Sequence, residues 1–522
     1  MVFSSLTFLW IFLPCVLLIN YLFSFIKNQR IKIICKNANL LIASIVFYAW
    51  GGIWYVFVMI ASITGNYLFA LLINHYKAKE KLEIQAIEPP PYENNDDINY
   101  ENIVFSSENV ASISVTTSSS KKISSKTSKK IAFVFCLLFN LGLLFYFKYT
   151  NFFIGIIESI ARADFGLKEV ILPIGISFFT FQAMSYVIDV YLGKVECQKN
   201  FFTLALYISL FPQLVAGPIV KYSDVELQLK NREESVDKFV IGIKRFLYGL
   251  AKKVIIANVV GEVAEKIFST SIAEMGTAMA WIGIICYTIQ IYFDFSGYSD
   301  MAIGLGKMLG FDFLENFNYP YMSTSIKGFW RRWHISLSSW FKEYVYIPLG
   351  GNRKGKIRTY INLFIVFLLT GIWHGANYTF ILWGVFYGVF LVIERLFLGK
   401  WLDKNKIKPL NWLYTMFVVV LLWVFFRAPD VNYAFSYIGK MFDFSKSEMS
   451  VFYCVNLWQW IILFVGILLC GPMQTLFKKV YQKVKDKTWV FWGDYIIQFA
   501  LYGLCILLLI NNSFNPFIYF QF

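Results

Sequence analysis

Residues 316–356 read NFNYPYMSTSIKGFWRRWHISLSSWFKEYVYIPLGGNRKGK and residues 368–377 read LLTGIWHGAN; together they hold two of the chain's three histidines. The second histidine, His374, ends an apolar run of membrane length. An ionisable side chain is costly in lipid, so it is a functional candidate by default. The alternative is a histidine whose hydrogen bonds are satisfied by a neighbouring helix. Gly371 and Gly375 leave room for a ligand beside it, which favours a functional role for His374.

The segment around the other histidine, His334, has the spacing of an amphipathic helix. Apolar side chains recur at steps of three and four, at Trp330, Trp333, Leu337, Trp340, Phe341 and Tyr344. The opposite face carries Arg331, Arg332, Ser336, Ser338, Ser339, Lys342 and Glu343. We predict one helix at a membrane–water boundary, where aromatic rings and basic groups both find partners. The alternative is an interfacial anchor whose His334 only donates or accepts a hydrogen bond.

The composition is that of a membrane protein. Of the 522 residues, 57% are hydrophobic and 20% aromatic, and the mean hydropathy is +0.55. Soluble domains average about 45–50% apolar residues. The net charge of +15 resides in short loops between apolar runs, as expected for cytoplasmic loops. We therefore predict an all-α polytopic membrane protein, with the lipid bilayer and not nucleic acid as its partner.

Metal and disulfide chemistry have little support in the sequence. The eight cysteines are scattered, mostly within apolar runs, and form no CxxC pair. With only three histidines in the chain, we predict no metal site. The N-terminus lacks a basic region and a cleavage site, so we expect a retained first span and not a removed signal.

The chain divides into four predicted parts. Residues 1–77 form N-terminal transmembrane helices, and the basic residues after the first span place the N-terminus outside. Residues 78–130 are acidic and then rich in Ser, Thr and Lys, which predicts a disordered cytoplasmic loop. This loop is either a tolerated insertion or a platform for phosphorylation. Residues 131–427 form the core and residues 428–522 further transmembrane helices, giving about ten to twelve crossings in all.

Two further segments interrupt the apolar pattern. FPQLVAGPIV, residues 211–220, contains two prolines and a glycine, which cannot all lie within a regular helix. Broken backbone at membrane depth survives only where protein or a cavity covers it, which indicates an internal pocket. Asp294 and Ser296 close another apolar run. They are either a helix cap or part of the wall of a site.

Four motifs carry a resemblance to a known family. FPQLVAGPIVKYSDV (211–225), DFSGYSDMAIGLGKMLGF (294–311), the stretch from Asn316 to Gly351, and GIWHGANYTFILWG (371–384) resemble the membrane-bound O-acyltransferase (MBOAT) family. The similarity is greatest to its bacterial branch, which acts in O-acetylation of alginate and related cell-envelope polymers. The resemblance implies a multi-pass protein of the bacterial cell membrane, with a ring of tilted helices around a central funnel and tunnel and the donor entering from the cytoplasm. The loop at 78–130 is longer than this branch leads us to expect.

The resemblance also implies roles for both histidines. His374 matches the invariant histidine of the family's WHG motif, and His334 matches the second histidine, in RRWHISLS. A hydroxyl that attacks a thioester needs a base, and a neutral imidazole can serve near neutral pH. We expect His374 to be this base or an orienting group, and His334 to position the acyl carrier or polarise the site. No GxSxG motif is present, so direct transfer is simpler than an acyl-enzyme.

The implied donor is acetyl-CoA, as a substrate and not a bound cofactor. Arg331, Arg332 and Lys342 would meet its phosphates if they face the cytoplasm, or would extend to lipid headgroups instead. The candidate substrate-binding set is completed by Trp330, Asp294, Ser296 and Asn377.

The expected function is O-acetylation of an extracytoplasmic polysaccharide, such as an alginate-like polymer, cellulose or peptidoglycan. The acetyl group would pass directly or through an extracytoplasmic acetyltransferase or a polysaccharide synthesis complex. Transfer of D-alanyl or another acyl group remains open, as does a non-catalytic exporter or scaffold. Acyl transfer from a labelled thioester separates the enzyme from these last two.

Overall fold

The computed structural model describes residues 1–85, 124–405, 407–444, 450–484, 487–511 and 514–518. These ranges contain helices and connecting segments but no β-strand. Nine of the described helices are long and apolar enough to cross a membrane, and the bent pair Leu457–Leu469 and Met473–Val484 raises the number to ten. Ile176–Leu192 is a shorter apolar helix. The all-α polytopic class is therefore confirmed, with a number of spans at the lower edge of the prediction.

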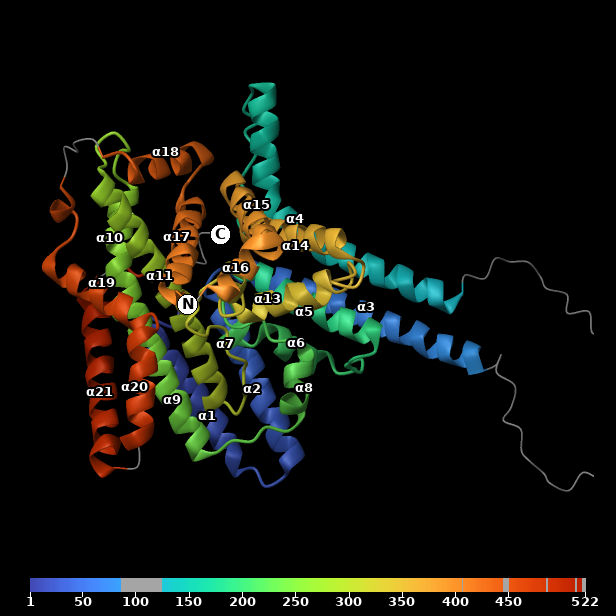
Figure 1. Ribbon diagram of the computed structural model, residues 1–522. Helices are drawn as coiled ribbons and strands as arrows, with labels where there is room; N and C mark the ends of the chain where they lie inside the picture. Colours follow the sequence, from blue (N-terminus) through green and yellow to red (C-terminus); the bar gives the residue numbers. More distant parts are fainter. Residues whose placement is uncertain (86–123, 406, 445–449, 485–486, 512–513, 519–522) are drawn as a thin grey trace, which may run out of the picture.

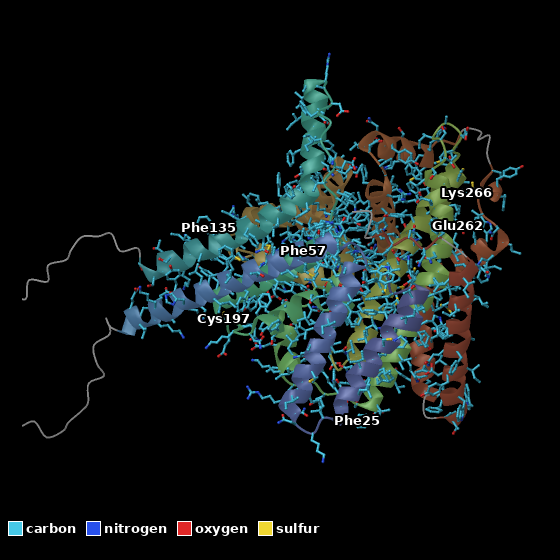
Figure 2. The ribbon with its side chains drawn as sticks, turned by 180° about the vertical axis from the view of Figure 1, so that it is seen from behind. Phe25, Phe57, Phe135, Cys197, Glu262 and Lys266 are labelled. Atoms are coloured by element: carbon cyan, nitrogen blue, oxygen red, sulfur yellow. The ribbon has the colours of Figure 1, made fainter. Side chains whose placement is uncertain are left out.

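The N-terminal helices form one side of the molecule. The first span joins η1 (Phe8–Phe12), α1 (Leu13–Leu22) and η2 (Phe23–Phe25), and is followed by α2 (Gln29–Ala49), α3 (Ile53–Gln85) and α4 (Ser125–Ala161). α3 and α4 project together from the rest of the bundle (Figure 1). Their outward apolar side chains include Phe57 and Phe135, both 59% exposed (Figure 2). Such side chains fit a surface that faces lipid.

The helices on either side of the long loop extend further than the sequence pattern predicts. α3 continues to Gln85 and α4 begins at Ser125, so both ends of the predicted 78–130 loop are helical. The hydroxyl of Ser125 donates to Glu83, and Lys129 forms an ion pair with Glu80. These contacts pair the two helix ends. The remainder of the predicted loop, 86–123, lies outside the described residues.

The predicted break in the membrane segment at Pro212 and Pro218 is confirmed. After α5 (Ile176–Leu192), α6 (Phe201–Ser209) and α7 (Phe211–Leu214), the chain runs irregularly through residues 215–220, all of them buried, to α8 (Tyr222–Lys230). Neighbouring side chains form hydrogen bonds with backbone groups that lack helical partners at this break. Ser44 accepts from Phe211 N at 3.0 Å, Tyr207 donates to Val220 O at 2.9 Å, and Ser336 accepts from Ile219 N at 3.0 Å. Protein groups thus replace the water that lipid excludes.

The most buried of the described membrane spans is α11 (Thr277–Met308), which packs against α9 (Val236–Ala251), η4 (Lys252–Ala257) and α10 (Asn258–Phe268). Its approach to α9 depends on small residues. A Cβ at Gly249 would lie 2.6 Å from the carbonyl oxygen of Gly297, and one at Gly304 would lie 2.6 Å from that of Gly242. Paired glycines of this kind allow two helix backbones to touch.

The remaining elements complete the bundle around the two histidines. They are η5 (Pro320–Met322), α12 (Ile326–Trp330), α13 (Ile335–Phe341), η6 (Lys342–Tyr346), α14 (Lys356–His374), α15 (Tyr378–Ile393), η7 (Glu394–Leu398), α16 (Gly399–Lys404), α17 (Lys408–Arg427), α18 (Val431–Met441), η8 (Val451–Tyr453), α19 (Leu457–Leu469), α20 (Pro472–Val484) and α21 (Thr488–Asn511). α14 and α15 form a tight hairpin in which Gly371 contacts Gly384.

Candidate active site

His334 lies at a break between two short helices. The prediction of one continuous amphipathic helix is wrong, because α12 ends at Trp330 and α13 begins at Ile335. His334 is the N-cap of α13 and has left-handed backbone angles, with φ +43° and ψ +56°. A non-glycine residue in this region is strained by about 1–3 kcal/mol and persists only where its surroundings impose it. Such strain is often found at functional sites.

The segment that imposes this conformation begins at Asn316. Its carbonyl oxygen accepts from Ile335 N at 2.9 Å, and Arg332 O accepts from Asn318 N at 2.9 Å. The Asn316 side-chain oxygen accepts from Ser336 N at 3.1 Å and lies 3.2 Å from His334 Nδ1. These bonds replace the helical ones that a continuous helix would make. Hydrogen bonds therefore join the segment that begins at Asn316 to the segment around His334.

The same contacts fix the protonation of the His334 ring. A backbone N–H can only donate, so the Asn316 atom facing Ser336 N is the amide oxygen. Because this oxygen accepts, His334 Nδ1 carries a hydrogen. Burial also lowers the pKa of His334. The side chain is thus a neutral imidazole with a defined tautomer.

His374 is the last residue of α14 and is 5% exposed. Aromatic rings enclose its imidazole. The ring centroids of Trp373, Trp383 and Phe426 lie 5.0, 5.2 and 5.0 Å from that of His374. The Trp373 ring also lies 6.3 Å from the His334 ring. The fold therefore brings the two histidines, forty residues apart in sequence, into one aromatic cluster.

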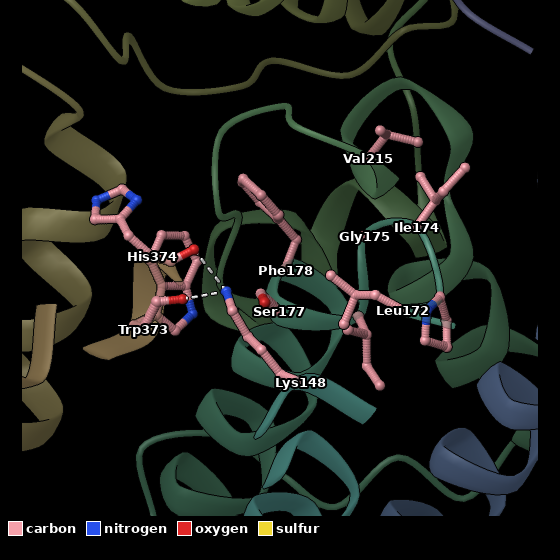
Figure 3. A pocket seen from close by; sticks show the side chains of 11 residues that line it. Lys148, Leu172, Ile174, Gly175, Ser177, Phe178, Val215, Trp373 and His374 are labelled. Carbon is pink, nitrogen blue, oxygen red and sulfur yellow. Dashed lines mark hydrogen bonds between the residues drawn. The ribbon is translucent and has the colours of Figure 1, made fainter. Parts of the chain in front are cut away.

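His374 lines two cavities. The first has a volume of about 60 Å³ and is enclosed by residues 172–178, Lys148, Val215 and Trp373 (Figure 3). The second is smaller and is lined by Asp294, Phe295, Trp333, Trp383 and Ile518, among others. Neither cavity is lined by His334. Of the two histidines, His374 is thus the one that borders both cavities. Its carbonyl oxygen faces Lys148 in the first cavity, and its imidazole is directed away from the other residues drawn there (Figure 3).

A third and much larger cavity, of about 700 Å³, lies between α12, α13, α14 and α16. Three of the predicted substrate-binding residues, Trp330, Arg331 and Lys342, line it. Arg332 does not. Further basic residues on the walls are Lys327, Arg395, Lys400 and Lys408. The Trp330 ring lies 5.7 Å from the Trp383 ring, which in turn contacts His374. Aromatic side chains therefore separate the basic cavity from the histidine cluster.

The other predicted residues have different surroundings. Asp294 forms a buried ion pair with Lys253 at 2.7 Å and faces the second cavity. Ser296 is buried on α11 and lines none of these three cavities. Asn377 caps α15, accepting from Thr379 N at 3.0 Å and donating to Pro429 O at 2.7 Å. These are the contacts of a helix cap.

Sequence reasoning missed the contribution of the C-terminal segment. Residues 514–518 enter the core, where Ile518 N donates to Asp294 Oδ2 at 2.9 Å. Lys253 donates to the carbonyl oxygen of Pro516, and Asn515 donates to Ser4 O at 2.8 Å. Residues 514–518 thus contact both the N-terminal Ser4 and the wall of the second cavity; the N and C marks lie close to each other in Figure 1. No local pattern marks a contact between residues 224 positions apart.

Comparison with known proteins identifies the family. Residues 197–438 match the model of the membrane-bound O-acyltransferase family. The "Probable alginate O-acetylase AlgI" of Pseudomonas putida is 36% identical over 100% of both chains. The chain belongs to the membrane-bound O-acyltransferase family. Its sequence resemblance is thereby confirmed, and the protein is a multi-pass membrane acyltransferase.

Two further proteins are similar over smaller parts of the chain. The "Peptidoglycan O-acetyltransferase" of Helicobacter pylori is 33% identical, covering 84% of this chain and 80% of the relative. The "Teichoic acid D-alanyltransferase" of Bacillus subtilis is 30% identical, covering 48% of this chain and 66% of the relative. Both matches are weaker than the match to the alginate protein.

The side chains at this site suit the transfer of an acyl group from a thioester to a hydroxyl. Imidazole is the side chain whose proton exchange operates near neutral pH. Aromatic rings enclose the His374 imidazole, and such an enclosure would limit the hydrolysis of a thioester. A neutral imidazole in such surroundings is suited to accepting a proton.

Proposed function

We propose that this acyltransferase moves an acetyl group from a cytoplasmic thioester to a hydroxyl on the opposite side of the membrane, with His374 as the general base. The single observation that carries this assignment is that His374 lines both small cavities. His374 takes the hydroxyl proton while the oxygen bonds to the acyl carbon. The carbon–sulfur bond then breaks, and the leaving thiolate takes the proton from the imidazolium. The products are an ester and a free thiol.

His334 acts as the positioning partner in this scheme. Its backbone is held in place from Asn316, and its ring shares the Trp373 contact with His374. A misplaced substrate loses orientation, and a shift of about 1 Å can cost about 10²-fold in rate. His334 therefore contributes to substrate placement more than to proton transfer.

The donor is acetyl-CoA, which enters as a substrate through the basic cavity. Arg331 and Lys342 on its wall support binding of a phosphorylated carrier. Glu394 and Asp403 also lie there, so the charge is mixed although basic residues predominate. Lipid headgroups are the competing partners for these side chains. The basic loops also support a cytoplasmic location for this face and an N-terminus outside.

The acceptor is a hydroxyl of an extracytoplasmic polysaccharide, reached directly or through a partner acetyltransferase or a polysaccharide synthesis complex. The names of the alginate and peptidoglycan relatives support this class. D-alanyl transfer is the second candidate, because the Bacillus subtilis relative is named for that reaction. Parallel assays with acetyl and D-alanyl thioesters separate the two.

The test compares three histidine variants, purified in detergent and assayed with labelled acetyl-CoA over a range of donor concentrations. His374→Ala should reduce transfer by about 10²-fold or more through loss of the base. His334→Ala should also reduce it, with part of the loss in KM. His75→Ala is the matched control, because His75 is exposed on α3 away from the site.

Full activity in His374→Ala would contradict the mechanism. A loss in His334→Ala that no substrate concentration restores would instead mean that both imidazoles serve the chemical step. Wild-type protein that transfers neither acyl group, yet supports polymer export, would favour the exporter or scaffold.

A further inference from the structure

The helix that carries His374 ends abruptly in the interior. α14 stops at His374, because the next residue, Gly375, has extended backbone angles of φ −165° and ψ +154°. The last carbonyls of any helix lack partners within it. Water cannot satisfy them where the bilayer or protein excludes it. The end of α14 therefore needs donors from another element.

Two consecutive residues of α4 supply these donors. Lys148 Nζ donates to the carbonyl oxygen of His374 at 2.8 Å and to that of Trp373 (Figure 3). The hydroxyl of Tyr149 donates to Ile372 O. Three successive carbonyls of α14 are thus bonded by two successive side chains. Of these two side chains, only Lys148 bonds to the carbonyl oxygen of His374 itself.

The Lys148 side chain is also held in place by its surroundings. Its ammonium lies 5.7 Å from the centroid of the Trp373 ring, and it lines the first cavity together with His374. Within the described part of the chain it forms no ion pair with a carboxylate. A cation at the C-terminal end of a helix is stabilised by the helix dipole. The carbonyls of α14 are therefore its principal polar partners.

We propose that Lys148 is a positioning residue that holds the His374 imidazole in place by binding the backbone at the end of α14. This inference depends on the proposed role of His374 as the base. Without the ammonium, the last turn of α14 loses two bonds on the residues that carry the Trp373 and His374 rings. The imidazole is then free to shift relative to the substrate, and orientation is lost.

Simple helix capping makes a different prediction from positioning. A capping residue supports stability only, and Tyr149, which bonds the same helix end, would serve equally well. Positioning requires that the bond to His374 itself affects turnover. Variants of Lys148 and Tyr149, the two α4 residues that bond to the end of α14, therefore provide a matched comparison.

The experiment measures kcat, donor KM and thermal midpoint for Lys148→Met, Lys148→Arg and Tyr149→Phe in the full-length purified protein. Lys148→Met should lower kcat by about tenfold or more, with donor KM within about threefold of wild type. Lys148→Arg, which keeps the cationic donor, should recover most of kcat. Tyr149→Phe should lower the thermal midpoint while leaving kcat within about threefold.

Unchanged kcat in Lys148→Met would refute the proposal. If Lys148→Met and Tyr149→Phe lose the same kcat at the same thermal midpoint, Lys148 acts only as a helix cap. If Lys148→Met does not accumulate, Lys148→Gln takes its place with the same comparisons. The two proposals fail on different results. Full activity in His374→Ala would contradict the role of His374 as the base. An inactive His374→Ala together with a fully active Lys148→Met would contradict only the positioning role of Lys148.

Discussion

Replacing Asn316 by alanine removes the side chain that holds His334 in its left-handed conformation. Asn316 is fully buried. Its oxygen accepts from Ser336 N at 3.1 Å, and from His334 Nδ1 at 3.2 Å. A buried donor left without a partner costs about 1–3 kcal/mol. His334 is fully buried and Ser336 only partly so, and we therefore expect a loss of at least about 1–3 kcal/mol in the free energy of unfolding.

Activity should fall with this loss of stability, because the strained backbone at His334 is then free to relax. We expect Asn316→Ala to lower transfer at saturating donor by about tenfold or more. The assay pairs thermal unfolding in detergent with acetyl transfer at a temperature well below the midpoint. Asn318→Ala is the control: Asn318 is exposed, and its backbone bond to Arg332 O at 2.9 Å survives the change.

A second variant at the same position tests the tautomer. Asn316→Asp keeps an acceptor for both donors, so most of the stability should return. Its carboxylate favours the protonated imidazole and so raises the pKa of His334. The neutral ring is then lost below that raised pKa, and transfer should fall as the pH drops from about 8 to about 6. Wild-type protein, in which burial lowers the pKa of His334, should show no such loss from this residue.

Wild-type stability and transfer in Asn316→Ala would refute this reasoning. An equal loss in Asn318→Ala would show that the segment matters and the Asn316 side chain does not.

Three further predictions concern the rest of the chain. Lys253→Met leaves Asp294 as a buried, unpaired charge and should lower the free energy of unfolding by about 3–5 kcal/mol, measured by thermal unfolding. Replacing both members of the pair by apolar residues should recover most of this loss, and a double variant as unstable as Lys253→Met would contradict the prediction. Deleting residues 88–121, while keeping the contacts of α3 with α4, should leave membrane insertion and transfer largely intact, and an inactive but well-inserted deletion would give the segment a function. A single cysteine at Ser118 in a cysteine-free background should resist an impermeant thiol reagent in intact cells and react after lysis; labelling of intact cells would invert the topology.

The sequence alone was sufficient for the class of the protein and for its family. Membrane spans depend on hydropathy within about 20 consecutive residues, so they are visible locally. The break at Pro212 and Pro218 was equally visible, because a proline beyond the first turn of a helix removes a hydrogen bond and clashes with the preceding turn. The two histidines were found because ionisable groups are rare in such runs and because their motifs resemble those of MBOAT proteins.

Tertiary structure alone decided how these residues are held. Helical spacing predicted a continuous helix through His334, but bonds from Asn316, eighteen residues away, outweigh local propensity there. Lys148 and His374 are 226 positions apart, and Ile518 reaches Asp294 across 224. In the sequence Lys148 is one more basic residue and Ile518 one more apolar one. Only folding brings them to the site, because side-chain chemistry sets what a residue can bind, and the packing of distant helices sets what it meets.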